Sequence, residues 1–578
     1  MSAAVSFGQN FNPTVEVTNT YQGNSSEVHK PQLEMNVPDS LLRFDLDFDY
    51  EVFAKPYQGA YSFKPYTLDM RPGKDAWRGR SLYLKAGAGY SLRPRLEFVF
   101  SPEQSGPFQM SVYASHKSYF GRYHGIAPDL KDDGIYRLNK SGDGFGGYDA
   151  LTAAGFDGLY SWDKTILSFG VGYYGLAAKD TVMSRSYNAF DFNARVRSNN
   201  DAERYFLYDI ALNGRIANDR LDYKSFGFPG NTSVEGQNES WFILDGQVGP
   251  VFDSKRSFIV GFTGETASYG KFYDGSAGRI ALTPNYRLKS GRWNLNLGVR
   301  LEMLFRSEAS DTLFFRKMSG GKGQVIYPDV HVDFLAGKNV TLFAEAKGGS
   351  RLDTYSSKIS NSHHLNPSFL VSKDAVSVGQ LVDNTVEKLN ARIGVRGSAA
   401  SAFWYEVNGG VGIYGNLAME SGLFLESGFV PTVEYSDANI LYANALLGWK
   451  DERFCVDAQL RYRNLSFQDS KADNLGFGLP AYSGFVKAAY NITSRLYAGI
   501  SVEAASWREG KCASAVSEEF VKARVPGYVD LGLNCGYRFN RKLEFWLESG
   551  NLLCQTVQRN PFYAEKGLWV TGGIALNL

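Results

Sequence analysis

The sequence has little of what usually reveals how a chain of 578 residues works. Its 4 cysteines are too few to suggest a disulfide scaffold. Its 61 basic and 60 acidic residues give a formal net charge of +1, which offers no electrostatic argument for a nucleic-acid partner. No stretch approaches the roughly 18 uninterrupted apolar residues of a membrane helix. These shortages argue against a disulfide-rich domain, a basic nucleic-acid binder and a helical membrane protein.

Aromatic residues and glycine, in contrast, are plentiful. Aromatic side chains make up 15% of the chain, and there are 61 glycines. This composition suits β-structure with tight turns and aromatic belts at a membrane interface. A chain without apolar helices can cross a membrane only as a closed barrel, because that is the other fold that satisfies every backbone polar group in lipid.

Apolar and polar residues alternate most clearly over residues 292–305. One face carries Trp293, Leu295, Leu297, Val299, Leu301 and Met303, and the other carries Arg292, Asn294, Asn296, Gly298, Arg300 and Glu302. The same period of two, typical of strands, recurs over 340–347, 453–463, 495–503 and 543–548. A sandwich would bury the apolar face, whereas a membrane barrel turns it toward lipid and leaves charges in a wet lumen. Alternation alone fits both.

The connectors between these strands distinguish the two folds. Short turns are predicted at 162–163, 253–254, 290–291, 338–339, 450–451, 494 and 540–541. Long connectors are predicted at 119–143, 218–236, 307–322, 354–384, 416–436, 465–479, 507–525 and 554–566. Bacterial barrels alternate short periplasmic turns with long outward loops in this way.

The sequence therefore predicts an all-β fold, a large closed antiparallel transmembrane β-barrel of about 22 strands over residues 81–578. Its first strand is expected near Leu82–Tyr90. An even strand number returns the chain to its starting side, so both ends would be periplasmic. The expected location is the outer membrane of a Gram-negative cell.

The segment before the barrel is of a different kind. Residues 1–9 are small and uncharged, and we interpret them as a signal-peptide remnant, although an ordinary chain terminus has the same look. Residues 10–80 contain one alternating stretch, Leu42–Tyr50, between prolines. They are predicted to form a short periplasmic or lumen-inserted segment; an extended tail along the barrel base fits equally well.

Two C-terminal motifs carry a family resemblance. Gly550-Asn551-Leu552-Leu553 and Asn560-Pro561-Phe562-Tyr563 precede a final alternating strand from Gly567 to Leu578. This arrangement resembles the last two strands of TonB-dependent receptor barrels, whose terminal strand is recognised by the barrel-assembly machinery. The final-strand residues that the resemblance assigns to insertion are Leu568, Val570, Ile574, Leu576 and Leu578. The chain departs from the family in having only about 70 residues before the barrel, less than a full plug domain.

Polar residues on the expected lumen face are the candidate site. They are Arg300, Glu302, Asp329, His331, Asp333, Glu345, Lys347, Arg392, Arg396, Arg461, Arg463, Asp530 and Arg538, and Lys388 is also expected to point inward. Such charges tune selectivity for a polar solute, although any wet lumen needs polar walls.

Three further features contain residue types that can carry chemistry. Asp329, His331 and Asp333 share one strand face and could activate water, but one strand cannot supply a whole catalytic site. His363 and His364 are adjacent in a long loop, without an evident third metal ligand. Cys512 and Cys554 fall in late outward loops, where they could pair.

We therefore expect no enzyme activity, no metal and no cofactor. The favoured function is solute or nutrient passage across the outer membrane. The alternatives are a non-transporting barrel that scaffolds a complex with lipoproteins and, less favoured, an outer-membrane hydrolase. The expected partners are outer-membrane lipids, the assembly machinery during insertion, and surface lipoproteins or other outer-membrane proteins, without nucleic acid.

Overall fold

The structure is a computed structural model of the whole chain, and it describes residues 81–578 with internal gaps. The gaps are at 91, 103–105, 181–182, 199–204, 224–235, 272, 307–322, 366–368, 371–376, 379–380, 400–401, 426–427, 468–475 and 515–519. The predicted signal-peptide remnant and the segment 10–80 both lie outside the described residues.

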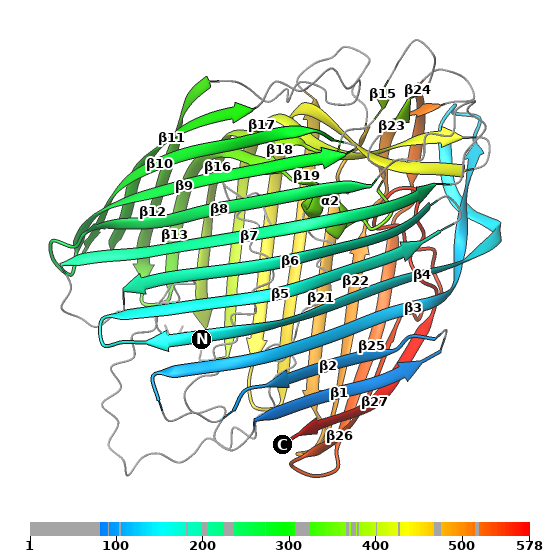
Figure 1. The fold of residues 1–578 in the computed structure, drawn as a ribbon, viewed down its shortest axis with the longest axis horizontal. Coiled ribbons are helices and arrows are strands. Elements are labelled where there is room, and N and C mark those ends of the chain that lie inside the picture. Colours follow the sequence, from blue (N-terminus) through cyan, green and yellow to red (C-terminus); the bar gives the residue numbers. More distant parts are fainter. Residues whose placement is uncertain are drawn as a thin grey trace, which may run out of the picture.

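The described chain forms a closed antiparallel barrel of 22 strands, as the alternation and connectors predicted. The strands are β1 (Leu82–Gly89), β2 (Arg95–Phe100), β3 (Phe108–Leu130), β4 (Tyr136–Ser161), β5 (Thr165–Lys179), β6 (Met183–Ser198), β7 (Phe206–Tyr223), β8 (Gln237–Pro250), β9 (Arg256–Lys271), β10 (Gly275–Ser290), β11 (Trp293–Arg306), β12 (Gly323–Gly337), β13 (Val340–Asp353), β16 (Asp383–Ala399), β17 (Phe403–Leu425), β18 (Gly428–Lys450), β19 (Phe454–Phe467), β21 (Tyr482–Asn491), β22 (Leu496–Ala505), β25 (Tyr528–Arg538), β26 (Leu543–Gly550) and β27 (Trp569–Asn577). Pairing of β1 with β27 closes the ring, and Figure 1 shows the two ends of the barrel sheet side by side. Closure leaves the barrel no exposed sheet edge.

The outer surface of the barrel is apolar, as expected of a wall that faces lipid. On β11, Leu297, Val299 and Leu301 are 46%, 43% and 43% exposed, whereas Glu302 on the opposite face is only 4% exposed. The predicted assignment of the two faces of this strand is therefore confirmed.

Among the described residues, no helix is both long enough and apolar enough to cross a membrane.

The two sides of the barrel wall differ in height. Strands β17 and β18 have 23 residues each, and β3 and β4 have 23 and 26, whereas β26, β27, β1 and β2 have 8, 9, 8 and 6. The predicted long connectors at 119–143 and 416–436 are thus wrong. Most of their residues continue the ladder as hairpins, leaving only 131–135 and 426–427 between the strands.

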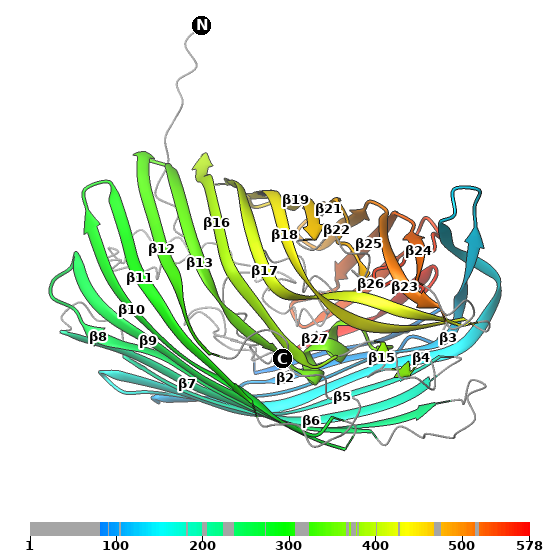
Figure 2. The ribbon, with the colours of Figure 1, turned by 90° about the horizontal axis from the view of Figure 1, so that it is seen from above.

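Above the low side, three short strands form an outer tier: β20 (Gly476–Phe477), β23 (Arg508–Ser514) and β24 (Phe520–Val525). β24 pairs with β4, and β23 pairs with β17. In Figure 2 the yellow β17 and β18 sweep across toward the cyan hairpin of β3 and β4. The outer tier therefore connects the two tall hairpins across the low side of the barrel.

Candidate functional site

The loop between β13 and β16, residues 354–382, folds into the barrel near its long-loop end. It contains α2 (Tyr355–Asn361) and a small hairpin of β14 (Phe369–Leu370) and β15 (Ser377–Val378). Thr354 caps the helix by accepting a hydrogen bond from the backbone N–H of Ser357. Tyr355 and Ile359, one helical turn apart, are completely buried. We call this segment the inward loop.

The inward loop packs on an apolar patch of the inner wall. The patch is contributed mainly by β4 to β10, and its wall residues are Leu151, Tyr174, Leu176, Tyr187, Ala189, Ala217, Trp241, Ile243, Ala267, Tyr269 and Ala277. Tyr355, Ile359, Leu365, Leu381 and Val382 of the inward loop join the same cluster. The patch is a hydrophobic core inside the barrel, so water is excluded from this part of the lumen wall. We call these wall residues the dry patch.

A buried ion pair anchors the C-terminal side of α2. The Arg185 Nε donates to Asp219 at 2.9 Å, and neither side chain is exposed to solvent. The same guanidinium donates to the carbonyl oxygens of His363 at 2.7 Å and Leu365 at 2.6 Å. Tyr355 donates its hydroxyl to Asp219 at 2.5 Å. Wall and loop thus share one network, which satisfies the carbonyls that follow the helix.

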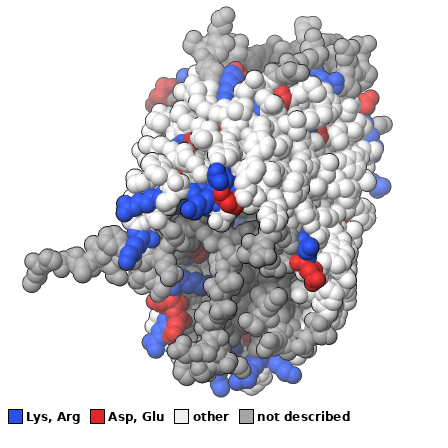
Figure 3. Space-filling model, turned by 90° about the vertical axis from the view of Figure 1, so that its left-hand side faces the viewer, with Lys and Arg blue, Asp and Glu red and all other residues white. Residues whose placement is uncertain are grey.

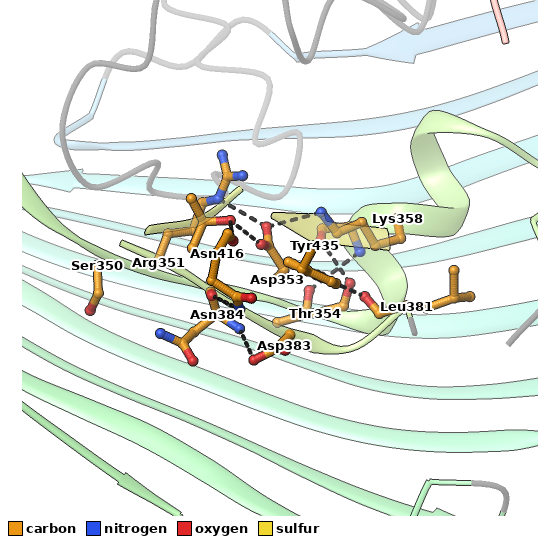
Figure 4. A network of polar contacts seen from close by, with 12 residues as sticks. Ser350, Arg351, Asp353, Thr354, Lys358, Leu381, Asp383, Asn384, Asn416 and Tyr435 are labelled. Atoms are coloured by element: carbon orange, nitrogen blue, oxygen red, sulfur yellow. Dashed lines mark hydrogen bonds and ion pairs between the residues drawn. The ribbon is translucent and has the colours of Figure 1, made fainter. Parts of the chain in front are cut away.

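The N-terminal side of α2 is held in a similar way. Glu239 of β8 accepts hydrogen bonds from the backbone N–H of Ser356, at 3.0 Å, and from its hydroxyl. Asp353 lies 3.1 Å from the Lys358 ammonium and 2.9 Å from Arg351. Figure 4 shows the Asp353 carboxylate between these two cations. Burial lowers the pKa of Lys358, and the charge of Asp353 opposes this shift.

A second loop, residues 551–568 between β26 and β27, also folds inward. The Asn551 side chain organises it by donating to the carbonyls of Gln555 and Lys566 at 2.8 and 3.2 Å. Arg559 donates to the carboxylates of Glu503 on β22, at 2.9 Å, and Asp530 on β25, at 2.7 Å. Asn551 belongs to the first motif of the family resemblance, so that motif secures this loop.

The two loops meet above the lumen. The ring of His364 stacks on Tyr563 with centroids 3.8 Å apart and planes inclined by 19°. His363 lies 3.0 Å from Asp149 of β4, and His364 lies 3.4 Å from Asp180. The inward loop begins at the end of β13, and its His363 contacts β4. Nine strand pairings separate β13 from β4 around the barrel. In a ring of 22 strands this is almost half the circumference, so the inward loop crosses the mouth.

Seven of the thirteen predicted lumen residues gather on β12, β13 and β16. Arg392 donates to Glu345 at 2.8 and 2.6 Å, and Arg396 donates to Asp333 at 2.8 Å. His331 lies between them, 3.1 Å from Asp333 and 3.8 Å from Glu345. Lys347 also pairs with Glu345, and Asp329 lies opposite Lys347 in the ladder. We call this set the charged cluster.

The other predicted residues lie elsewhere. Arg300 and Glu302 pair at 2.9 Å, and Glu302 reaches the backbone N–H of Ser350 at the foot of the inward loop. Arg461 and Arg463, on β19, hydrogen-bond Gln459 and Ser483 respectively. Asp530 holds Arg559 of the second loop, and Arg538 is 3.6 Å from Glu544 near the short-turn end. The thirteen residues therefore do not form one site.

One orientation predicted from the alternation is wrong. Lys388 was expected in the lumen, but it is exposed and lies 3.5 Å from the equally exposed Asp437. The register of β16 shifts between Glu387 and Leu389, which marks a β-bulge. An extra residue in a strand reverses the facing of the side chains around it, so a strict period of two fails there.

The remaining candidates are placed as follows. On β27 and just before it, Leu568, Ile574 and Leu578 are exposed, whereas Val570 and Leu576 are half-buried. Cys554 is an exposed free thiol, and the side chain of Cys512 lies outside the described residues. Within the described part of the chain, no group of three or more His, Cys, Asp and Glu side chains is arranged to hold a metal ion.

The sequence reasoning missed the dry patch. Trp241, Phe242, Ile243 and Leu244 are consecutive in β8, so this strand is apolar on both faces. Trp241 is 1% exposed inside the barrel, and Leu244 is 43% exposed outside it. A barrel strand that is apolar on both faces turns one face to lipid and needs protein to cover the other. This run was the signal for an element packed inside the barrel.

Comparisons with known proteins find similarity in structure only. No family model matches the sequence, and no curated protein does. A mutant of the ferric enterobactin receptor from Pseudomonas aeruginosa matches with a TM-score of 0.58 at 12% identity, over 86% of this chain and 80% of that one. The pyoverdine outer membrane receptor from Pseudomonas aeruginosa PAO1 matches with 0.59 at 11%, over 86% and 78%. The copper transporter OprC matches with 0.61 at 13%, over 86% and 80%.

The chain has the fold of the large outer-membrane receptor barrel. The resemblance seen in the C-terminal motifs is thereby confirmed at the level of fold. The matched proteins are receptors and a transporter rather than enzymes.

Proposed function

We propose that this protein takes part in the passage of a solute across the outer membrane, through a lumen whose outer mouth is narrowed by its own two inward-folded loops. The observation that carries the proposal is the span of the inward loop, which crosses from β13 to β4 and joins the second loop at the His364 and Tyr563 stack. The fold shared with siderophore receptors and a copper transporter supports this.

The charged cluster is where we infer that a passing polar solute is contacted. It presents carboxylates and guanidiniums on neighbouring strands, with Phe343 beneath Arg392 and Arg396 at 5.6 and 5.3 Å. Charged side chains that line a pore set its selectivity. Replacing Arg396 by Gln should shift the reversal potential toward cations, with the lipid-facing Leu342→Ala as a control that leaves it unchanged.

Planar-bilayer recording of the purified chain tests the passage itself. The variant Tyr355→Ala/Ile359→Ala removes the core contacts of α2, so it should raise the conductance above that of the parent chain. A second variant lacking residues 10–75 should do the same if that segment also obstructs the lumen. Heat-modifiable mobility on gels verifies that each variant is folded.

The result that defeats the proposal is the absence of conductance in the parent and in both folded variants. Stable co-purification with a lipoprotein in mild detergent, without conductance, would instead favour the scaffolding role.

For the terminal strand we propose recognition during insertion, through the outward side chains of Leu568, Ile574 and Leu578. Ile574 lies in the closing seam, where β27 pairs with β1, and the carbonyl of Leu578 accepts a hydrogen bond from the backbone N–H of Leu82. The variant Ile574→Asn/Leu578→Asn should reduce the amount of folded barrel in the membrane severalfold, whereas the lumen-facing Thr571→Ser should not. Normal assembly of the double variant would refute this role.

A further inference from the structure

Seven of the ten turns at one end of the barrel carry a described basic side chain; the turns at 101–107 and 400–402 carry none, and the turn at 199–205 lies largely outside the described residues. The seven turns join β4 to β5, β8 to β9, β10 to β11, β12 to β13, β18 to β19, β21 to β22 and β25 to β26. Their exposed basic residues are Lys164, Lys255, Arg292, Lys338, Arg453, Arg495, Arg541 and Lys542. Figure 3 looks toward this end and shows Lys and Arg side chains spread over it, with Asp and Glu side chains next to several of them. We call this set the basic rim.

Acidic residues only partly offset the basic rim. They occur in three of the seven turns, as Asp163, Asp253, Asp451 and Glu452. Asp253 and Asp451 accept hydrogen bonds from the backbone N–H groups of their own turns, at 2.7 to 2.8 Å, so they also shape those turns. The turns at 291–292, 338–339, 492–495 and 539–542 carry basic charge alone.

Exposed aromatic residues next to these turns indicate how deep the basic rim lies. Trp162 and Trp293 are each 48% exposed, Phe252 is 58% and Phe539 is 56%. Each is within three residues of a basic side chain of the rim. Aromatic side chains on the outside of a membrane protein mark the headgroup level. The lysines and arginines are therefore at the depth of lipid phosphates rather than on a surface that projects into water.

The opposite end of the barrel has a different charge pattern. In the turn at 131–135, Lys131 is accompanied by Asp132 and Asp133, and Arg137 pairs with Asp133 at 2.6 Å. In the outer tier, Arg524 pairs with Glu509. In these two described places at the long-loop end, basic side chains are therefore paired with or next to acidic ones, whereas four turns at the short-turn end carry basic charge alone.

We propose that the basic rim binds the phosphates of anionic phospholipids, of the phosphatidylglycerol type, in the leaflet that the short turns face. Single contacts of this kind are weak, but side chains at the headgroup level act together on the same layer of lipids. Charge attraction at this distance is screened by salt over about 10 Å at 0.1 M ionic strength. An acidic soluble protein is the less favoured partner, because the aromatic residues keep the rim within the headgroup layer.

The test uses the full chain in phosphatidylcholine vesicles and quenching of its tryptophans by brominated lipids. Trp162 and Trp293 lie at the rim and report the lipids there. The ratio of quenching by brominated phosphatidylglycerol to brominated phosphatidylcholine should show at least a threefold preference for the anionic lipid at low salt. The preference should fall to about one in 1 M salt.

Two matched variants identify the residues responsible. Lys255→Gln/Arg292→Gln/Lys338→Gln/Arg495→Gln removes four charges from the basic rim and should abolish the preference. Lys131→Gln/Lys179→Gln/Lys271→Gln/Lys522→Gln removes four exposed charges from the other end and should keep it. No preference in the parent chain, a preference that survives in the rim variant, or equal loss in both variants would overturn the proposal. Binding of an acidic soluble polypeptide without any lipid preference would overturn it as well.

Discussion

The inner wall of this barrel has two contrasting regions, the dry patch on β4 to β10 and the charged cluster on β12, β13 and β16. Both are built from strands in which every second residue points inward. Under the inward loop those residues are Leu176, Ala217 and Trp241, each buried in a hydrophobic cluster. On the other region they are Asp333, Glu345 and Arg396, joined by ion pairs. Because the two regions share the same strand geometry, we infer that the packing of the inward loop, rather than the barrel fold itself, determines where the lumen wall is wet.

The largest effect is expected from the ion pair that joins the dry patch to the loop. Arg185→Met leaves Asp219 buried without its guanidinium and removes two hydrogen bonds to loop carbonyls. Breaking a buried pair on one side costs about 3–5 kcal/mol, so the loop should undock. Hydrogen exchange of the α2 amides measures this.

A pair on the same two strands provides the control. Arg195 and Asp209 also join β6 to β7, but their side chains are 37% and 21% exposed. Arg195→Met should change loop protection little, because exposed pairs contribute about 0–1 kcal/mol. Equal effects of the two variants would remove the contrast between the dry patch and the rest of the wall.

The next largest effect is expected at Trp241. Trp241→Ala leaves a cavity in the dry patch and removes the indole hydrogen bond to Glu265, which is 2.8 Å long. Loss of a buried Trp costs about 3–5 kcal/mol, of which partial collapse of the loop onto the wall should recover a share. Protease sensitivity of the inward loop should therefore rise, while Leu244→Ala, on the lipid face of the same strand, should leave it unchanged. Equal sensitivity would show that the loop does not depend on the patch.

A smaller effect is expected where the two loops touch. His364→Ala removes the stack on Tyr563, an interaction of about 1 kcal/mol, whereas His364→Phe keeps an aromatic ring there. More frequent opening events in single-channel recordings of the Ala variant, restored in the Phe variant, would place the contact at the moving part of the mouth. Identical recordings for both variants would contradict this.

The smallest effect is a pH dependence at Lys358. Because burial lowers its pKa in the folded protein, the docked loop holds the proton less tightly than the undocked loop does. Stability of docking should therefore rise as pH increases from the lowered pKa toward the ordinary lysine value, and remain constant above it. Hydrogen exchange of α2 between neutral and alkaline pH measures this trend, and Lys358→Met should abolish it. A trend that persists in this variant must come from another group.

Much of the barrel was predictable from the sequence, and the reason is physical. A lipid-facing strand must be apolar at every second residue, so β11 could be assigned from Trp293 to Met303 without any knowledge of its partners. The strand number could be counted because short turns and long connectors alternate between successive strands. Strand length could not be assigned in this way. Above the membrane the hairpins of β3–β4 and β17–β18 meet water on their outer side, and their polar residues looked like loop.

The site was less predictable, because it depends on contacts between distant segments. Arg185, Asp219 and Glu239 appear in the sequence as ordinary inward polar residues of three strands, and only the docked helix makes them a binding surface for Tyr355 and Ser356. Lys388 was misplaced because a single inserted residue reverses the period. The apolar run beginning at Trp241 was the one local signal that something covers the inner wall.

The inward loop also has a mechanical consequence. A thin cylindrical shell resists stretching but flattens easily under sideways load, and a rod fixed across its opening removes that freedom. The inward loop links two distant parts of the wall in this way, because it is continuous with β13 and is bound to β4 through His363 and Asp149. We therefore expect the cross-section to stay nearly constant at the long-loop end, and changes of barrel shape under membrane tension to be concentrated at the end with short turns.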